Sequence, residues 1–145
     1  MNNFLKLRHK FEEQPCSVNS INDEYSILII SRQDFKIEYY KPVYTFSYLE
    51  KRECQSDNFA YGEAYEWLLS YTFNQVDLEK AQIKITNSSN IQIFFESPIS
   101  LIVVNKKSGY KHSAILLNEL NIPLSYIEDT LDIFNLLKKI KKSNF

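Results

Sequence analysis

The stretch SILIISRQDFKIEYYKPVYTFSY, residues 26–48, contains the clearest indication of fold class in this chain. Its apolar run at 27–30 has the length and the β-branched character of a buried strand. Apolar and polar residues then alternate over 35–39 and again over 44–48, which is the period of a strand with one buried face. The polar segment between the first two runs, at 32–34, is short, so the pattern predicts an antiparallel meander.

The second half of the chain carries the same alternation. A proline at 98 is expected to end one strand, and the polar residues at 106–109 are expected to form a hairpin turn. Apolar residues recur at every second position in three segments, which are each predicted to be strands: 81–86, 91–96 and 99–105.

Two segments have the period of helices that pack one face against a sheet. The first is residues 59–74, which Asp57 or Asn58 would cap. The second is residues 125–141, where Ser125 and Glu128 match a capping box. The expected buried residues are Tyr61, Ala64, Tyr65, Leu68 and Thr72 in the first helix, and Ile127, Thr130, Leu131, Phe134, Leu137 and Ile140 in the second.

These elements predict an α+β fold, made mainly of antiparallel sheet with two principal helices, in a single domain over residues 1–145. Residues 4–11 fit a strand or a helix, and residues 110–117 fit a strand or a short helix. Residues 12–22 are expected to form a loop. If residues 4–11 are the first strand, the order ββββα occurs twice, which resembles the order of elements in Whirly-type single-strand-binding proteins.

Residues that commonly carry catalysis or bind cofactors are scarce. The chain has two histidines and two cysteines, none in a metal-ligand spacing, and its two glycines do not form a phosphate-binding loop. We therefore expect no enzymatic activity, no catalytic residue, no cofactor and no metal. The first residues lack the character of a signal peptide, and no segment approaches the roughly 18 apolar residues of a membrane span. We expect a cytoplasmic protein without a membrane partner.

Charge is segregated along the chain, although the formal net charge is only −1. Residues 53–79 contain six acidic and no basic residues, and residues 112–137 contain four acidic and again no basic residues. Because soluble surfaces normally intersperse both signs, these acidic blocks are candidates for binding a protein partner. The candidate partner-binding residues are Asp57, Glu63, Glu66, Trp67, Glu128, Asp129 and Asp132.

In these features the chain resembles bacterial immunity proteins of polymorphic-toxin and contact-dependent growth-inhibition systems. It is small, begins without a leader, is rich in Tyr, Phe and Ile, and has the acidic block at 53–79. The resemblance implies a protein that binds and neutralises one cognate toxin, often a basic nuclease, and some members have Whirly-like folds. We therefore expect an inhibitor whose acidic, aromatic-containing surface covers a toxin with a basic surface.

A single-stranded nucleic-acid-binding module is the alternative. Aromatic residues on the predicted meander, with basic residues near them, would provide a sheet face on which bases stack. The sequence pI of about 6.1 lacks the basic footprint that such a module usually has, which favours the inhibitor. The residues concerned are Tyr39, Tyr44, Phe46 and Tyr48, with Lys36, Lys41, Lys51 and Arg52.

Overall fold

The predicted meander forms the first long hairpin of the structure. A computed structural model describes residues 2–22, 26–56, 59–87 and 89–142 of the chain, and within these ranges the side chains of 26, 54–64 and 112–114 lie outside the description. Strand β2 (Ser26–Tyr40) pairs antiparallel with β3 (Val43–Ser56), and Tyr39 faces Tyr44 next to the turn. The strands expected at 27–30, 35–39 and 44–48 are therefore confirmed.

The turn expected at 32–34 is instead a bulge inside β2. The register against β3 shifts between Gln33 and Lys36, and Asp34 has a φ of 58°. Aspartate tolerates this left-handed conformation better than most residues because its short side chain can bond locally. A bulge bends a strand without ending it, so two predicted strands form a single one.

The helix predicted over residues 59–74 is wrong. This segment is strand β4 (Phe59–Asn74), which pairs with β3 along its length and with β6 (Asn90–Asn105) over residues 67–72. Its apolar residues satisfy both a period of 3.6 and a period of 2. Hydrogen bonding to a strand on each side favours the extended form, because a helix here would leave β3 and β6 without their common neighbour.

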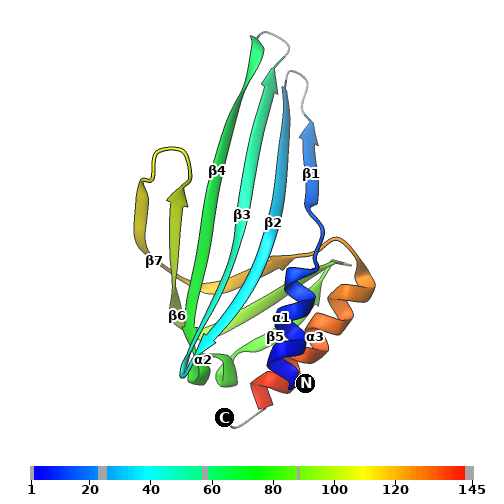
Figure 1. Ribbon diagram of the computed structural model, residues 1–145, viewed down its shortest axis with the longest axis vertical. Helices are drawn as coiled ribbons and strands as arrows, with labels where there is room; N and C mark the ends of the chain where they lie inside the picture. Colours follow the sequence, from blue (N-terminus) through cyan, green and yellow to red (C-terminus); the bar gives the residue numbers. More distant parts are fainter. Residues whose placement is uncertain (1, 23–25, 57–58, 88, 143–145) are drawn as a thin grey trace.

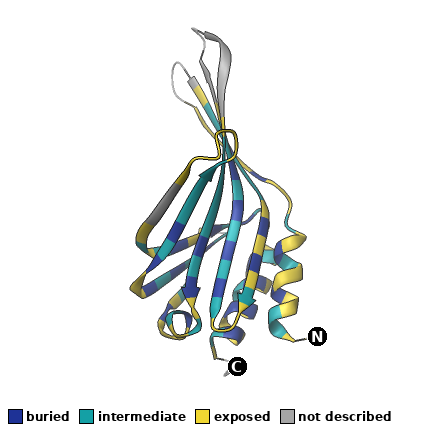
Figure 2. Cartoon of the chain, turned by 60° about the vertical axis from the view of Figure 1, so that its left-hand side comes forward, coloured by how far each residue is buried: buried dark blue, intermediate teal, exposed yellow. Residues whose placement is uncertain are grey.

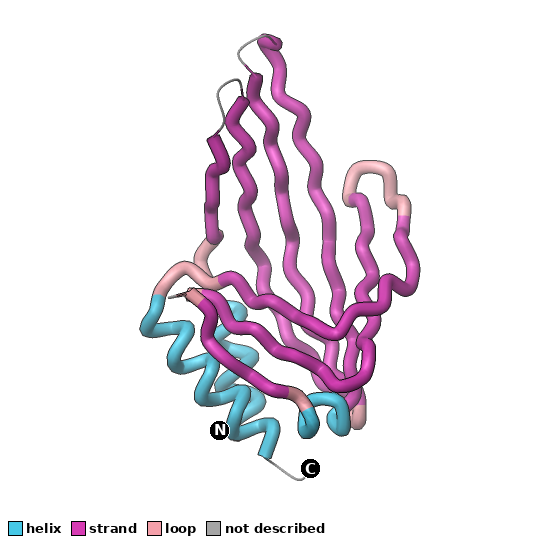
Figure 3. Tube along the Cα trace, turned by 180° about the vertical axis from the view of Figure 1, so that it is seen from behind, coloured by secondary structure: helices cyan, strands magenta, loops and turns pink. Residues whose placement is uncertain are grey.

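The second half contains a short helix and three strands. They are α2 (Gln75–Lys80), β5 (Gln82–Thr86), β6 and β7 (Lys111–Pro123). The break expected at Pro98 is a bend within β6, where the register against β7 shifts between Phe94 and Ile99. Residues 90–94 of β6 pair with β5, whereas residues 100–105 pair with β4, so the bend turns the sheet back on itself (Figure 3). The hairpin turn at 106–109 is confirmed, with Gly109 at a φ of 72°.

The ambiguous N-terminal segment is a helix, α1 (Asn3–Glu12), and the Asn2 side chain accepts a hydrogen bond of 2.8 Å from the Leu5 amide. Part of the segment expected as loop is strand β1 (Ser17–Asn22), which pairs with β2. The expected C-terminal helix is confirmed as α3 (Ile127–Lys142). The capping box expected at its start is not formed, since the Ser125 hydroxyl is buried without a hydrogen-bond partner among the described residues.

The α+β class with a mainly antiparallel sheet and two principal helices is confirmed. The strand order is β1-β2-β3-β4-β6-β5, with β7 paired to β6. Among the described residues, four strands lie between α1 and α2 and three between α2 and α3, so the order ββββα occurs once and is followed by βββα. Helices α1 and α3 lie together at one end of the curled sheet, and β2, β3 and β4 extend well beyond them (Figure 1).

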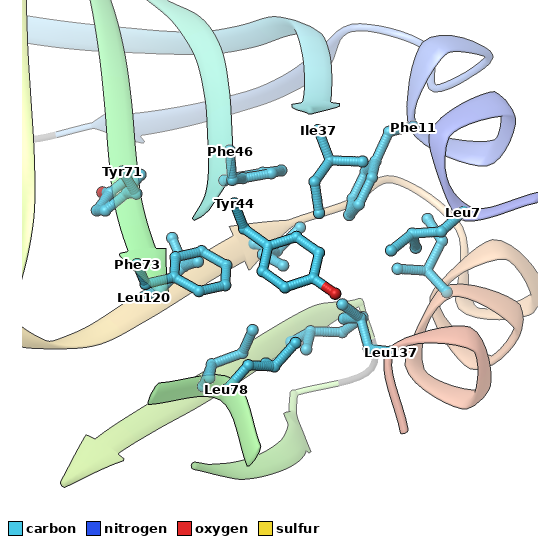
Figure 4. Packing of buried hydrophobic residues seen from close by; sticks show 14 of the residues in the cluster. Leu7, Phe11, Ile37, Tyr44, Phe46, Tyr71, Phe73, Leu78, Leu120 and Leu137 are labelled. Atoms are coloured by element: carbon cyan, nitrogen blue, oxygen red, sulfur yellow. The ribbon is translucent and has the colours of Figure 1, made fainter. Parts of the chain in front are cut away.

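The core lies between the helices and one face of the sheet, here called the inner face. It is the face that carries Tyr44, Phe46 and Tyr48 on β3, all at most 5% exposed. The ring of Phe11 from α1 lies 5.2 Å from that of Phe46, and Leu7 packs nearby (Figure 4). Buried and more exposed residues alternate along the strands, so the sheet has one covered and one solvated face (Figure 2).

The buried face of α3 differs in part from the predicted one. Thr130, Leu137 and Ile140 are buried as expected, and Phe134 packs at the edge of the core. Ile127 and Leu131, however, are each 45% exposed, so their predicted burial is wrong. Ile133 and Leu136 are buried in their place, because contact with α1, β5 and β6 sets the rotation of the helix.

Candidate functional site

A group of polar and aromatic side chains lies on the inner face where the sheet extends past the helices. The alternation that buries Tyr44, Phe46 and Tyr48 continues along β3 and places Glu50 and Arg52 on the same face. Arg32 on β2 is the cross-strand partner of Glu50, and on the other side of β3 the partner of Glu50 is Trp67. Tyr65 is paired with Arg52. We call Arg52, Tyr65 and Trp67 the upper inner face.

Glu50 orients two arginines at once. Its side chain is 5% exposed, and its Oε1 and Oε2 lie 2.9 Å from Nε of Arg32 and 3.1 Å from Nε of Arg52. Removing a carboxylate from water costs roughly several kcal/mol, so a buried carboxylate needs such partners to offset that cost. The cluster of Arg32, Glu50 and Arg52 therefore holds both guanidinium groups in defined positions and carries one excess positive charge.

The arginine nearer to solvent stacks with an aromatic pair. The guanidinium of Arg52 lies 5.6 Å from the ring centre of Trp67, and the rings of Tyr65 and Trp67 are 6.2 Å apart. Tyr65 is 44% exposed and Trp67 is partly exposed. Cation–π contact fixes the relative positions of these groups while leaving apolar surface accessible.

Two buried tyrosines lie beneath this cluster. Burial raises the pKa of the Tyr48 hydroxyl well above its ordinary value, and burial likewise raises the pKa of Tyr71. The two hydroxyls are hydrogen-bonded to each other. Both stay protonated at neutral pH and close off the hydrophobic core below the charged residues.

A polar pocket of about 350 Å³ adjoins Arg32. Its lining brings residues of β1, at one end of the strand order, together with residues 87, 89 and 90 next to β5, at the other end. Its lining consists of Ser17, Asn19, Arg32, Tyr48, Asn87, Ser89, Asn90, Asn121, Pro123 and Leu124. Arg32 is the charged residue of this lining, so the described wall of the pocket is rich in hydrogen-bonding groups and positive.

The structure does not place Glu66 of the first acidic block on the same face of the sheet as Trp67. Glu66 and Trp67 are consecutive in a strand and lie on opposite faces, and Glu66 is the cross-strand partner of Lys51. Residues three apart in a strand also alternate between faces, so the helix face expected to join Glu63 with Glu66 does not form. The Glu63 side chain and the whole of Asp57 lie outside the described residues.

Of the four acids in the second acidic block, Glu119 lies on β7 and the other three lie on α3. Nζ of Lys10 on α1 lies 3.3 Å from Asp132 and 3.8 Å from Asp129, and the hydrogen bond with Asp132 raises the pKa of Lys10. Glu128 is exposed. The groove of about 600 Å³ between the helices is lined by three lysines and two carboxylates, so the side of α3 toward α1 is not an acidic surface.

The rings expected to stack bases in the nucleic-acid alternative belong to the core. Tyr44, Phe46 and Tyr48 are 1%, 1% and 5% exposed, and Tyr39 stacks on Tyr44 with ring centres 4.5 Å apart. Bases cannot reach the three buried rings in the folded protein. An aromatic surface with an adjacent cation does occur among the described residues, but at Arg52, Tyr65 and Trp67.

The sequence pattern did not predict Arg32 and Glu50 as site residues. The signal that reveals Glu50 is the inward row on β3, which continues beyond Tyr48 without interruption. Arg32 has no comparable signal, because the bulge after it changes which positions of β2 face inward.

Comparison of the chain with protein-family models, with curated proteins and with solved structures returns no match. Within the described ranges, none of the helices combines the length and the apolar character needed to cross a membrane. No group of three His, Cys, Asp or Glu side chains in the described part of the chain is arranged to hold a metal ion.

Proposed function

We propose that this chain is a non-enzymatic inhibitor that binds and neutralises a toxin protein, and that it makes the contact with the upper inner face of its sheet. The class of partner comes from the resemblance of the sequence to bacterial immunity proteins. The contact surface replaces the expected acidic helix, since residues 59–74 form a strand.

The observation that carries the proposal is the composition of the upper inner face. Trp, Tyr and Arg are the residues most enriched among those that dominate protein–protein binding energies. Here Arg52 and Tyr65 each contact Trp67, and all three are at least partly exposed. They lie on β3 and β4, two of the strands that extend beyond α1 and α3 (Figure 1). Glu50 fixes Arg52 before binding, which reduces the entropy lost when a partner docks.

Inhibition would follow from coverage of the toxin. A partner surface that receives Trp67 and Tyr65 places the extended strands β2, β3 and β4 across itself, and these strands then exclude substrate from the groove they cover. The acidic groups on the outer face and on α3, such as Glu53 and Glu128, would steer a basic toxin toward this encounter rather than anchor it.

The test is to express the tagged chain together with its neighbouring open reading frames and to identify what co-elutes at moderate salt. We expect a stoichiometric basic protein, whose toxicity the chain relieves in co-expressing cells. Trp67→Ala should weaken binding by at least about 30-fold, which corresponds to the roughly 2 kcal/mol of a dominant contact. Tyr65→Ala, at a more exposed position, should weaken it in the same direction.

Two control variants locate the surface. Tyr40→Ala removes a ring that is 75% exposed on the outer face and should leave affinity unchanged. Glu66→Lys reverses a charge on the outer face and should slow association only slightly. Loss of binding in Glu66→Lys with full binding in Trp67→Ala would overturn the assignment of the surface. Co-elution of nuclease-sensitive material without a protein would replace the inhibitor by the single-stranded nucleic-acid alternative.

A further inference from the structure

The cluster of Arg32, Glu50 and Arg52 is electrostatically incomplete. One buried carboxylate faces two guanidinium groups, and among the described residues neither arginine ion-pairs with a second acid. Arg32 is 19% exposed, so water screens its charge only in part. An excess positive charge in such a half-buried position favours an anion beside it.

The hydrogen bonds to Glu50 use only the Nε–H of each arginine. A guanidinium has five N–H groups, of which four are on the two Nη nitrogens. In the described part of the chain, the Nη groups of Arg32 make no hydrogen bond with protein. Because Glu50 holds the Nε edge from behind, the ends of the guanidinium that match an oxyanion are left for a ligand.

The pocket beside Arg32 supplies neutral donors without adding a carboxylate. Asn19, Asn87 and Ser89, which carry neutral amide and hydroxyl groups, line it. Asn121, also in the lining, donates a hydrogen bond of 2.8 Å to Glu119, which itself does not line the pocket. The described wall therefore presents one fixed cation and several neutral polar groups.

We propose that this pocket binds a small oxyanion, a carboxylate or a phosphate group, on the Nη groups of Arg32. Glu50 acts as a positioning residue, and the amides of Asn19 and Asn87 lie at the pocket wall to contact the remaining ligand oxygens. The volume of about 350 Å³ admits a small metabolite rather than a polymer. The site does not depend on the proposed inhibitor role, because Trp67 and Tyr65 are outside its lining.

Isothermal titration calorimetry of the full chain with pyrophosphate and with malonate, at ionic strength held constant with chloride, tests the proposal. We expect saturable binding of at least one probe with a Kd of about 1 mM or lower, and a matching rise in melting temperature. Binding of pyrophosphate alone identifies a phosphate site, and binding of malonate alone identifies a carboxylate site. Absence of saturable binding of both probes would overturn the proposal.

Variants separate a built site from general attraction of anions. Arg32→Gln should weaken binding at least tenfold, whereas Lys51→Gln removes the same charge on the outer face of β3 and should leave Kd unchanged. Equal weakening by both variants would show non-specific attraction and would refute the site. Because Arg32→Gln also removes a partner of Glu50, a second variant is needed. Asn19→Phe places a ring from an exposed position of β1 into the pocket without changing charge. It should abolish anion binding in a protein that still melts cooperatively.

Failure of this site and failure of the inhibitor role are distinguishable. The anion titration needs no partner protein, and the co-elution experiment needs no anion. Asn19→Phe should lose the anion and keep the partner, while Tyr65→Ala should keep the anion and lose partner affinity.

Discussion

Nε of Arg32 donates a hydrogen bond of 2.9 Å to Oε1 of Glu50, and the Glu50 side chain that accepts it is only 5% exposed. The pair joins β2 to β3 at the level where the aromatic core ends and the uncovered part of the sheet begins. Glu50 needs both arginines as partners because it is buried. It also holds Arg52 in the proposed protein-binding surface and Arg32 in the proposed anion site.

Glu50→Gln should therefore destabilise the protein strongly. The substitution leaves two arginines near a neutral amide, and breaking a buried charge cluster in this way costs about 3–5 kcal/mol. Urea unfolding followed by circular dichroism measures the change in the free energy of unfolding. Glu53→Gln on the same strand is the matched control, since this exposed position should change stability by less than about 0.5 kcal/mol. Similar small effects of both variants on the free energy of unfolding would show that Glu50 is not buried between Arg32 and Arg52.

The rotation of α3 predicts that two of its apolar residues contribute differently to the free energy of unfolding. Ile133 is fully buried and Leu131 is 45% exposed, so Ile133→Ala should cost about 2–5 kcal/mol and Leu131→Ala about 1 kcal/mol or less. Thermal and urea unfolding of the two variants provide the comparison. The reverse order would favour the buried stripe predicted from the sequence, which includes Leu131 and omits Ile133.

Removing the hydroxyl from two buried tyrosines should have unlike consequences at neutral pH. The Tyr44 hydroxyl is buried without a hydrogen-bond partner among the described residues, so Tyr44→Phe should leave the free energy of unfolding unchanged or raise it. Tyr48→Phe breaks the hydrogen bond with Tyr71 and should cost about 1 kcal/mol. Chemical unfolding of both variants at one pH measures the difference, and an equal loss in both would contradict it.

Alkaline pH should destabilise the protein through the same residues. The pKa of tyrosine in the unfolded chain is about 10. Burial raises the pKa of Tyr48 above that value in the folded protein. The folded state then binds more protons than the unfolded state above that pH. This contribution to stability is complete below the unfolded pKa and is lost as the pH rises toward the folded pKa.

Unfolding free energies measured at several pH values above neutrality test this prediction. In Tyr48→Phe the decline of stability above about pH 10 should be shallower than in the parent chain. Parallel declines in the two proteins would mean that Tyr48 does not retain its proton when folded.

Strand β4 shows why part of the fold was not predictable. Leu68 fits the buried stripe of a helix, yet the residues at odd positions also alternate as in a strand: Tyr65, Trp67, Leu69, Tyr71 and Phe73. Local periodicity could not separate the two, because both periods place apolar residues on one side. The pairing of β4 with β3 on one edge and β6 on the other separates them.

The candidate site was predictable only in part for the same reason. Trp67 was predicted as a site residue because it is an aromatic residue within an acidic stretch. Its expected neighbours were therefore acidic residues on the same helix face. In the strand, its neighbours are the residues across the ladder, so Glu50 and Arg52 lie beside it and Glu66 faces the opposite side. Contacts between strands depend on register, which a single sequence does not specify.

By itself the sequence determined the strands of the first meander, the C-terminal helix and the α+β class, because these depend on local periodicity and on which residues need burial. Tertiary structure alone decided that residues 59–74 are extended, that β6 bends between Phe94 and Ile99 and that α3 turns Ile133 inward. Each of these depends on hydrogen bonds or packing with segments distant in the chain, whose free energy exceeds the weak local preferences of the residues concerned.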